Sequence, residues 1–193
     1  MNKTTHLLGG VVAAQLMNRY AGMPLDLGHT LAVVYAATVP DFDTNNSAAN
    51  KPSDLLPFGL GDLAIFRPVD AGAGLLGKVL STALKHRGPL HYPATYAALL
   101  GVWWIIANAG RAAWLPISEN LTHYAALLTP YLPLIGAGLL SHLVLDSQTR
   151  RGVAPLAPFS FWKLPRLRIS TGTWQEGLVA IALCAGSYTL WRL

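Results

Sequence analysis

Long stretches of uncharged, mostly apolar residues alternate along the chain with polar segments. Two of them, residues 92–110 and 124–145, come close to or exceed the roughly 20 residues that a helix needs to cross a bilayer. Residues 4–18 and 177–191 are shorter, and could span where the bilayer thins or flanking side chains reach the interface. Residues 29–40 are apolar but too short to cross, which indicates a half-span or a helix packed inside a bundle. The pattern predicts about five helices, one of them short.

Composition supports a membrane protein. Hydrophobic residues make up 52% of the chain and charged residues 12%, whereas soluble domains carry about 25% charged residues. This composition excludes a disordered chain and disfavours an ordinary soluble domain. The single cysteine, Cys184, excludes an intramolecular disulfide. We therefore predict an all-α, multi-pass membrane helical bundle that forms one domain over residues 1–193.

Charge suggests an orientation in the membrane. The polar loops at residues 41–91 and 147–175 each contain five Lys and Arg residues, whereas residues 111–123 contain one. Because basic loops favour the cytoplasmic side, we expect both long loops there and the short connection outside. Residues 52–77, rich in Gly and Pro, are interpreted as an irregular, partly ordered loop. The first apolar stretch is interpreted as a retained helix and not a cleaved signal.

The net charge of +5 raises the question of an anionic partner. Basic residues are scattered, and no zinc-finger, basic-zipper or aromatic RNA-binding signature is present, so no nucleic acid is expected. The expected partners are membrane lipids, whose anionic headgroups attract basic loops.

Histidine and acidic residues cluster near the predicted span ends on the cytoplasmic face. Such convergence is what a metal site with nitrogen and oxygen ligands requires. The residues that contribute to this pattern are His6, Asp41, Asp43, His86, His91, His142, Asp146 and Glu176.

The clearest local motif is the pair His142 and Asp146. Residues four apart share one helical face, so both could reach one metal ion or each could hold one of a pair. His142 lies about one turn inside the predicted span, where a polar side chain is costly, and this favours a function. The alternative is a histidine bonded to a helix neighbour, with Asp146 paired to Arg150.

A second motif, residues 86–91, places two imidazoles in a Gly- and Pro-containing turn before a helix. His86 and His91 are candidate ligands, and the guanidinium of Arg87 could clamp a phosphate or carboxylate. The alternative is a basic turn that binds lipid headgroups.

Asp41 and Asp43 follow the predicted short helix. In an extended segment, side chains two apart would not both reach one ligand, so we expect one to bind metal and the other to act as second shell or base. The alternative is polar termination of the helix. Acids at a helix C-terminus oppose the macrodipole, however, and favour a nearby cation.

The remaining titratable residues give weaker signals. His6 alone could be a solvated residue at a helix start. Glu176 fits a capping box in Thr173-Trp174-Gln175-Glu176 and is left out of the ligand set. His29 and His123 fall on the opposite membrane face in this topology and are not expected to bind metal.

Taken in order, the motifs resemble a known family. Thr5-His6, Pro40-Asp41-Phe42-Asp43, His86-Arg87-Gly88 with His91, Ser141 to Asp146, Thr149, Gly152 and Pro158-Phe159-Ser160 look like the LexA-regulated, inner-membrane-associated metal-dependent hydrolase family (YdjM-like). The resemblance implies a multi-pass inner-membrane protein with a helical core similar to zinc-dependent phospholipase C and P1-type nucleases. On that analogy the ligand positions are His6, Asp41, His86, His91, His142 and Asp146. Pro89-Leu90 departs from the family, which more often has Thr before this His.

These observations favour a hydrolase with one or two divalent ions, expected to be zinc, that cleaves an ester at the cytoplasmic membrane face. A phosphoester, such as that of a phospholipid, is the favoured substrate, with Arg87 neutralising charge and Asp43 as base. The alternative is a non-catalytic membrane protein whose structural metal or lipid-headgroup site recruits a partner. Haem binding is disfavoured, because no histidines are paired on facing helices at matched depth.

Overall fold

The computed structural model describes residues 1–43, 50–55, 63–64, 67–83, 89–109, 118–163 and 167–192. Over these residues the chain is helical, and its one β-type pairing is a bridge between Thr149 and Ile169. The α-helices are α1 (Lys3–Ala21), α2 (Leu27–Ala36), α3 (Arg67–Ala83), α4 (Pro93–Ala109), α5 (Glu119–Leu128), α6 (Leu132–Ser147) and α7 (Trp174–Arg192). Short 3-10 helices are η1 (Val39–Asp43), η3 (Pro52–Leu55), η6 (Pro89–His91) and η7 (Thr129–Tyr131). The all-α class is confirmed.

The sequence pattern missed two helices, α3 and α5. The prediction of an irregular loop over residues 52–77 is wrong from Arg67 onward, and that of a connection over residues 111–123 is wrong from Glu119 onward. Glycines weakened the helical signal of α3, but the helix packs against η1 and η3, and such packing supplies most helix stability in proteins. Asp70 in its first turn accepts hydrogen bonds from the backbone nitrogen and hydroxyl of Ser53.

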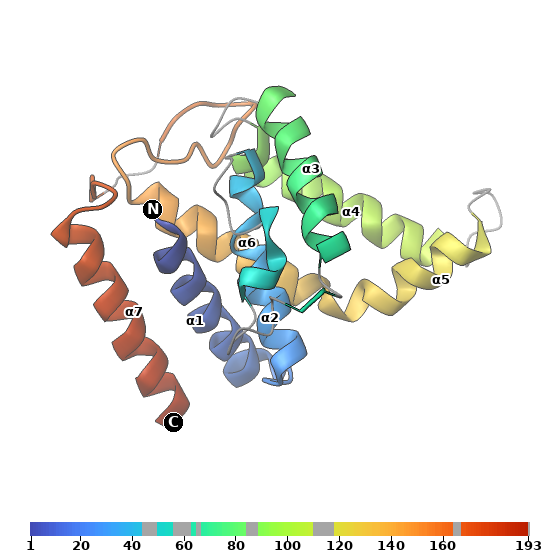
Figure 1. The fold of residues 1–193 in the computed structure, drawn as a ribbon, viewed down its shortest axis with the longest axis horizontal. Coiled ribbons are helices and arrows are strands. Elements are labelled where there is room, and N and C mark those ends of the chain that lie inside the picture. Colours follow the sequence, from blue (N-terminus) through green and yellow to red (C-terminus); the bar gives the residue numbers. More distant parts are fainter. Residues whose placement is uncertain are drawn as a thin grey trace.

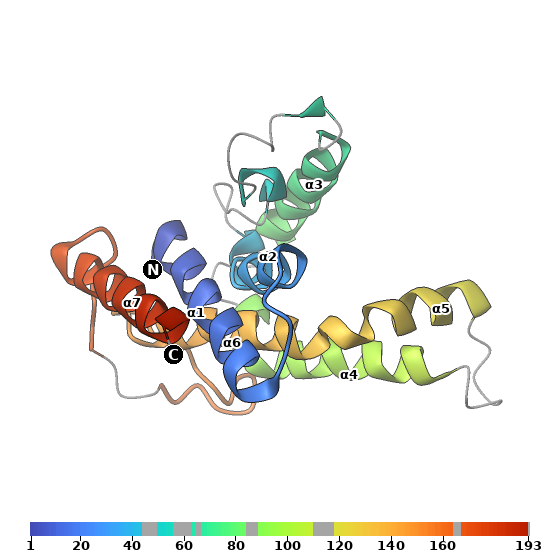
Figure 2. The same ribbon diagram turned by 90° about the horizontal axis from the view of Figure 1, so that it is seen from below.

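Helices α1, α2 and α6 form the centre of the molecule and lie side by side in both ribbon views (Figures 1 and 2). Ala14 of α1, Val33 of α2 and Leu134 of α6 are buried together in one apolar cluster. A second cluster joins α2 and α6 to Tyr96 of α4 and Val153. The core therefore holds together the helices that carry the candidate site residues.

Two glycines let these three helices approach closely. A Cβ atom at Gly10 of α1 would lie 2.8 Å from the Cα of Val34, and one at Gly138 of α6 would fall against the carbonyl oxygen of Val33. Both clashes are with the backbone of α2, which cannot give way as a flexible side chain would. Side chains larger than hydrogen would force the helices apart at both positions.

A helical arm extends from the central helices. Helices α4 and α5 pack along each other and project away from the core (Figure 2). Together α5, η7 and α6 form the stretch Asn120–Ser147, which among the described helices is the one both long and apolar enough to cross a membrane. The prediction of one strong span over residues 124–145 is confirmed, whereas the wider multi-pass arrangement stays a prediction.

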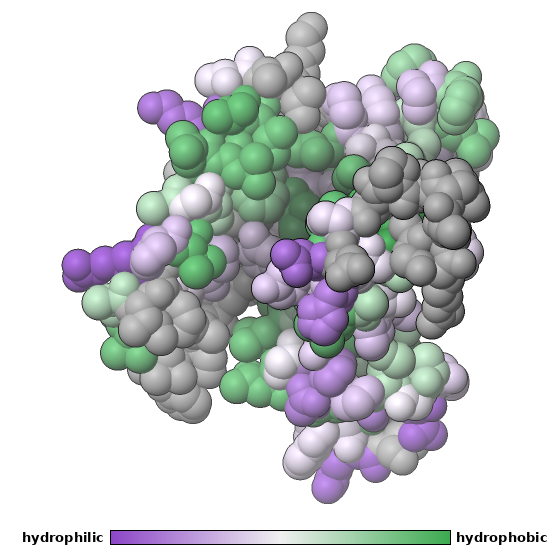
Figure 3. All heavy atoms as spheres, turned by 90° about the vertical axis from the view of Figure 1, so that its right-hand side faces the viewer, coloured by the Kyte–Doolittle hydropathy of each residue, from purple (hydrophilic) through white to green (hydrophobic). Residues whose placement is uncertain are grey.

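Large apolar side chains are exposed on several helices. They include Leu99, Val102 and Trp104 on α4, Leu140 on α6, and Ile181 on α7. Seen from the end where α4 and α5 project, apolar residues gather in broad patches on the surface, interrupted by hydrophilic ones (Figure 3). Exposed apolar side chains of this size suit contact with lipid.

The first turn of α7 is tied to the start of α1 through Glu176. Its carboxylate accepts hydrogen bonds from the backbone nitrogens of Asn2 (2.5 Å) and Gly172 (2.7 Å) and from the hydroxyl of Thr5 (3.1 Å). These three hydrogen bonds stabilise the charged carboxylate of Glu176 in its buried position. The capping box predicted a hydrogen bond from the backbone nitrogen of Thr173 to Glu176. In the structure the donor is the backbone nitrogen of Gly172, one residue earlier.

We expect Gly138→Ala to destabilise the protein, because its new methyl group would meet the backbone of α2. Overpacking of this kind costs about 1–3 kcal/mol, which should appear as a lower melting temperature in detergent. Gly136→Ala is the matched control on the same helix, since its Cβ would lie 3.9 Å from Leu100. Equal melting temperatures for the two variants would contradict the close approach of α2 and α6.

Candidate metal centre

The structure brings five of the predicted ligands together at one end of the central helices. They come from four different elements, and their side chains lie close together. The residues are His6 of α1, Asp41 of η1, His91 of η6, and His142 and Asp146 of α6. Their potential ligand atoms form two overlapping sets, His6 with His142 and Asp146, and Asp41 with His91 and His142, each within 4.8 Å.

The first turn of α1 places His6 in this space. Asn2 caps the helix by accepting a hydrogen bond from the backbone nitrogen of Thr5 (3.0 Å), which fixes where the helix begins. The imidazole of His6 is 1% exposed, and its Nε2 lies 3.4 Å from Oδ1 of Asp146. Among the described residues, neither ring nitrogen has a hydrogen-bond partner of good geometry. Both nitrogens are thus buried, and the one that carries no proton in the neutral ring has a lone pair available to a ligand.

On α6, His142 is held in a defined orientation. Its Nδ1 lies 2.8 Å from the carbonyl oxygen of Ala37, just after α2. A carbonyl oxygen can only accept, so Nδ1 carries the proton and donates it. In the neutral ring Nε2 then has a lone pair, which faces Oδ1 of Asp41 at 3.7 Å and Oδ2 of Asp146 at 3.9 Å.

The two 3-10 helices supply the remaining donors. Asp41 lies in η1, where its backbone nitrogen donates to the carbonyl of Thr38 (3.1 Å), so the segment is a 3-10 helix and not the extended segment we expected. His91 ends η6, and its Nε2 lies 3.5 Å from Oδ1 of Asp41 and 3.7 Å from Oδ2 of Asp146. The hydroxyl of Tyr96 donates to the carbonyl of Leu90 and steadies this turn.

The carboxyl of Asp41 titrates low in this setting. Burial raises its pKa, but the hydrogen bond from His91 and the nearby His142 and His6 outweigh burial and lower the pKa to about 2. Asp41 is therefore a carboxylate at neutral pH. Its side chain is 21% exposed, whereas those of the histidines and Asp146 are at most 2% exposed, so the cluster opens toward solvent on the Asp41 side.

Protonating the histidines would not satisfy this cluster. The rings of His6 and His142 stack with centroids 3.8 Å apart and planes 12° apart, so two imidazolium ions there would repel each other. Two carboxylates then face the Nε2 lone pair of His142, an arrangement that a cation would stabilise. The amino group of Met1, 2.5 Å from Oδ1 of Asp146, contributes one positive charge. Nitrogen and oxygen donors in this arrangement fit a divalent transition metal.

Some predicted residues lie elsewhere or cannot be placed. His86 and Arg87 fall outside the described residues, and Asp43 belongs to η1 without a described side chain. His29 lies at the start of α2, with Nδ1 2.6 Å from Asp26, and His123 lies on α5 beside Tyr124. As expected, neither joins the cluster.

Sequence reasoning missed the main-chain groups of the site. The carbonyl of Ala37 orients His142, and the amino group of Met1 contacts Asp146. Main-chain groups carry no residue-type signal, so no sequence pattern could have indicated them. No separate role was predicted for Thr5, which is buried next to His6. Its hydroxyl forms hydrogen bonds with the side chains of Asn2 and Glu176.

Comparison with known proteins gives one family. No curated protein and no solved structure matches the chain. A family model, YdjM inner membrane protein, matches residues 1–192. That description names a membrane location and no reaction, and the location agrees with the apolar span Asn120–Ser147. Because the match covers nearly every residue, the chain belongs to the YdjM inner membrane protein family.

Proposed function

We propose that this chain is a metal-dependent hydrolase of the inner membrane that cleaves an ester, preferentially a phosphoester. The observation that carries the proposal is the orientation of His142: its Nδ1 is committed to the carbonyl of Ala37, and its Nε2 lone pair faces two carboxylates. Such a carbonyl–histidine arrangement is how proteins orient metal-binding imidazoles. A structural histidine would instead direct both ring nitrogens toward protein partners.

The residues that would hold the metal are His6, Asp41, His91, His142 and Asp146, with His86 a further candidate by sequence. When bound, a divalent cation such as zinc would polarise the scissile ester and lower the pKa of a water molecule. The two oxygens of Asp146 face different histidines, Oδ1 toward His6 and Oδ2 toward His91, which suits either one ion or a bridged pair.

The asymmetry of burial favours catalysis over a closed structural site. Four of the five donors are almost fully buried, and Asp41 alone of the five is partly exposed. A substrate could therefore approach from the Asp41 side while the histidines remain shielded from solvent. Open coordination positions are typical of catalytic sites, whereas structural sites are closed by protein ligands.

Two further roles follow from the sequence. Asp43, two residues after Asp41, is the proposed base that removes the proton of the attacking water. Arg87 is proposed to neutralise charge that develops on the phosphoryl oxygens. Membrane lipids are the proposed source of substrate, because the site lies at the end of the span Asn120–Ser147 that carries His142 and Asp146.

We also propose that several helices besides this span enter the bilayer. α1 and α7 have 19 residues each and α4 has 17, close to the length required. Exposed apolar side chains on α4 and α7 support this arrangement. The basic loops then place the candidate metal centre at the cytoplasmic face.

Removing His6 should reduce metal binding without breaking a hydrogen bond within the described chain. We expect purified protein to contain one or two equivalents of zinc, and His6→Asn to bind zinc about 100-fold more weakly or worse. His29→Asn, outside the cluster, is the control and should retain the metal. Bound zinc is measured by mass spectrometry, and the melting temperature is measured with added zinc and with a chelator. Wild-type protein without stoichiometric metal and without a zinc-dependent melting shift would contradict the proposal.

The orientation can be tested by cysteine labelling after Cys184→Ser removes the native thiol, which is exposed. Asn120→Cys lies at one end of the span and Ser160→Cys lies beyond the other end. An impermeant maleimide added to intact cells should label position 120 and not position 160. The reverse pattern would place the metal centre on the outer face.

Catalysis is tested by Asp41→Asn, which preserves the shape of the side chain and removes its charge. We expect turnover of bis-p-nitrophenyl phosphate or of phospholipid in nanodiscs to fall about 100-fold or more, with weaker zinc binding. Asp26→Asn, a carboxylate paired with His29 outside the cluster, should have no effect. Arg87→Ala should keep the metal and lower kcat. Zinc-loaded wild-type protein that cleaves no ester would favour a non-catalytic membrane protein with a structural metal.

A further inference from the structure

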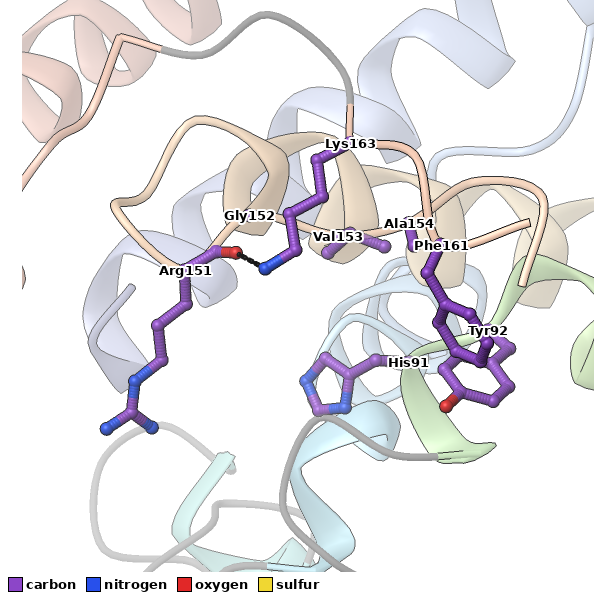
Figure 4. A pocket seen from close by; sticks show the side chains of 8 residues that line it. All are labelled: His91, Tyr92, Arg151, Gly152, Val153, Ala154, Phe161 and Lys163. Atoms are coloured by element: carbon purple, nitrogen blue, oxygen red, sulfur yellow. Dashed lines mark hydrogen bonds between the residues drawn. The ribbon is translucent and has the colours of Figure 1, made fainter. Parts of the chain in front are cut away.

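A pocket borders the candidate metal centre at His91. Its volume is about 290 Å³, and the residues that shape it include His91, Tyr92, Arg151, Gly152, Phe161 and Lys163 (Figure 4). In this view Arg151 lies on one side and the aromatic pair on the other, with His91 and Lys163 between them. His91 thus faces both the pocket and the carboxylate of Asp41, 3.5 Å from its Nε2. Anything bound in the pocket lies beside the candidate metal centre.

The segment that follows α6 fixes the backbone at Arg151 and brings Lys163 against it. Backbone hydrogen bonds pair it with the strand-like residue Ile169, which accepts from Arg150 (3.2 Å) and donates to Gln148 (3.0 Å). Gly152 then turns the chain with a φ of +64°, a conformation that favours glycine. Lys163 closes the segment by donating from Nζ to the carbonyl of Arg151 (2.6 Å). The two basic residues are therefore neighbours although twelve positions separate them.

The charges of the pocket indicate an anionic ligand. Its described lining includes two basic residues, Arg151 and Lys163, and no acidic residue. A guanidinium presents a planar set of donors that matches phosphate oxygens, and a lysine adds a compact charge. Two cations would add little to the binding affinity of a neutral carboxylic ester. They would add much to the affinity of a negatively charged phosphoester.

The size and the aromatic side of the pocket limit the ligand further. Tyr92 and Phe161 meet edge to face, with ring centroids 6.3 Å apart and planes at 72°, and form an apolar wall. At about 290 Å³ the pocket lies at the small end of ligand sites. It has room for a phosphate group and a short alcohol, and not for acyl chains.

We propose that this pocket binds the phosphate-bearing group of the substrate, with Arg151 and Lys163 as its anion-binding residues and Tyr92 and Phe161 against the alcohol portion. The inference rests on the proposed function, because the pocket matters for hydrolysis only if the neighbouring cluster holds a metal. Arg151 and Lys163 then supply binding cations in addition to Arg87, and their positions are set by the folded segment after α6.

The experiment measures equilibrium binding of radiolabelled inorganic phosphate to the full-length protein in detergent, with and without zinc. Arg151→Gln and Lys163→Gln should each weaken phosphate binding about tenfold, the typical effect of one charge-assisted hydrogen bond. Arg151→Lys should recover part of the loss. Arg150→Gln is the matched control, because Arg150 is the exposed neighbour of Arg151 and does not line the pocket.

Phosphate binding that survives both Gln variants would overturn the assignment. An equal loss in Arg150→Gln would also overturn it, because a general basic field would then explain the binding. Competition distinguishes the two sources of phosphate chemistry. Displacement by glycerol 3-phosphate would assign a soluble phosphoester, and displacement only by phosphatidic acid in nanodiscs would assign a lipid headgroup. Displacement by neither would refute a phosphoester ligand.

The same variants separate this inference from the proposed function. If no ester is cleaved but phosphate binding still depends on Arg151 and Lys163, the pocket assignment stands and the hydrolase proposal fails. If zinc-loaded protein hydrolyses p-nitrophenyl acetate while the phosphate affinity is the same in the Arg151 and Lys163 variants as in the wild type, the hydrolase proposal stands and the pocket assignment fails. Metal content, measured for every variant, should equal that of the wild type.

Discussion

The hydrogen bond from Nδ1 of His142 to the carbonyl of Ala37 is the interaction on which the site depends. It joins α6 to the residue just after α2, and it fixes which ring nitrogen keeps a lone pair. With the ring fully buried, that lone pair cannot be satisfied by bulk water, and the nearest polar atoms facing it belong to two carboxylates. The packed core thus leaves a buried lone pair facing two carboxylates, and a bound cation would stabilise this arrangement. Because this ring is fixed, the distances from it to the other candidate ligands define one site.

Close helix packing makes that hydrogen bond possible. Gly138 lies one turn before His142 on α6, and it is here that the helix meets the backbone of α2 at Val33 and Ala37. Gly10 does the same between α1 and α2, and the neighbouring Gly9 lies against Leu145 of α6, the helix that carries Asp146. Small residues at helix contacts are common in membrane proteins, where close approach replaces the hydrophobic effect as a source of association. The close helix contacts at these glycines therefore also position the candidate ligands.

The helical class, the strong span and the grouping of five titratable residues were predictable from sequence. Histidines and acids at the ends of apolar stretches converge wherever the helices run back and forth, which is why His6 and Asp146 could be grouped although 140 positions separate them. Helix α3 was missed because its glycines resemble a loop, and its stability comes from contacts with η1 and η3 that no local pattern contains. The pocket of Arg151 and Lys163 was missed because these residues become neighbours only through the turn at Gly152 and the pairing with Ile169.

Burial alone does not distinguish a functional carboxylate from a structural one, and this chain contains both kinds. Asp146 and Glu176 are 1% and 2% exposed. Glu176 accepts hydrogen bonds from two backbone nitrogens and a hydroxyl, donors that stabilise its charge and leave little for a metal to add. Asp146 instead faces the Nε2 atoms of three imidazoles, one of which has its lone pair fixed by Ala37, and its Oδ1 also contacts the amino group of Met1. The identity of the partners, more than the depth of burial, therefore makes Asp146 the candidate metal ligand and Glu176 the tether between α1 and α7.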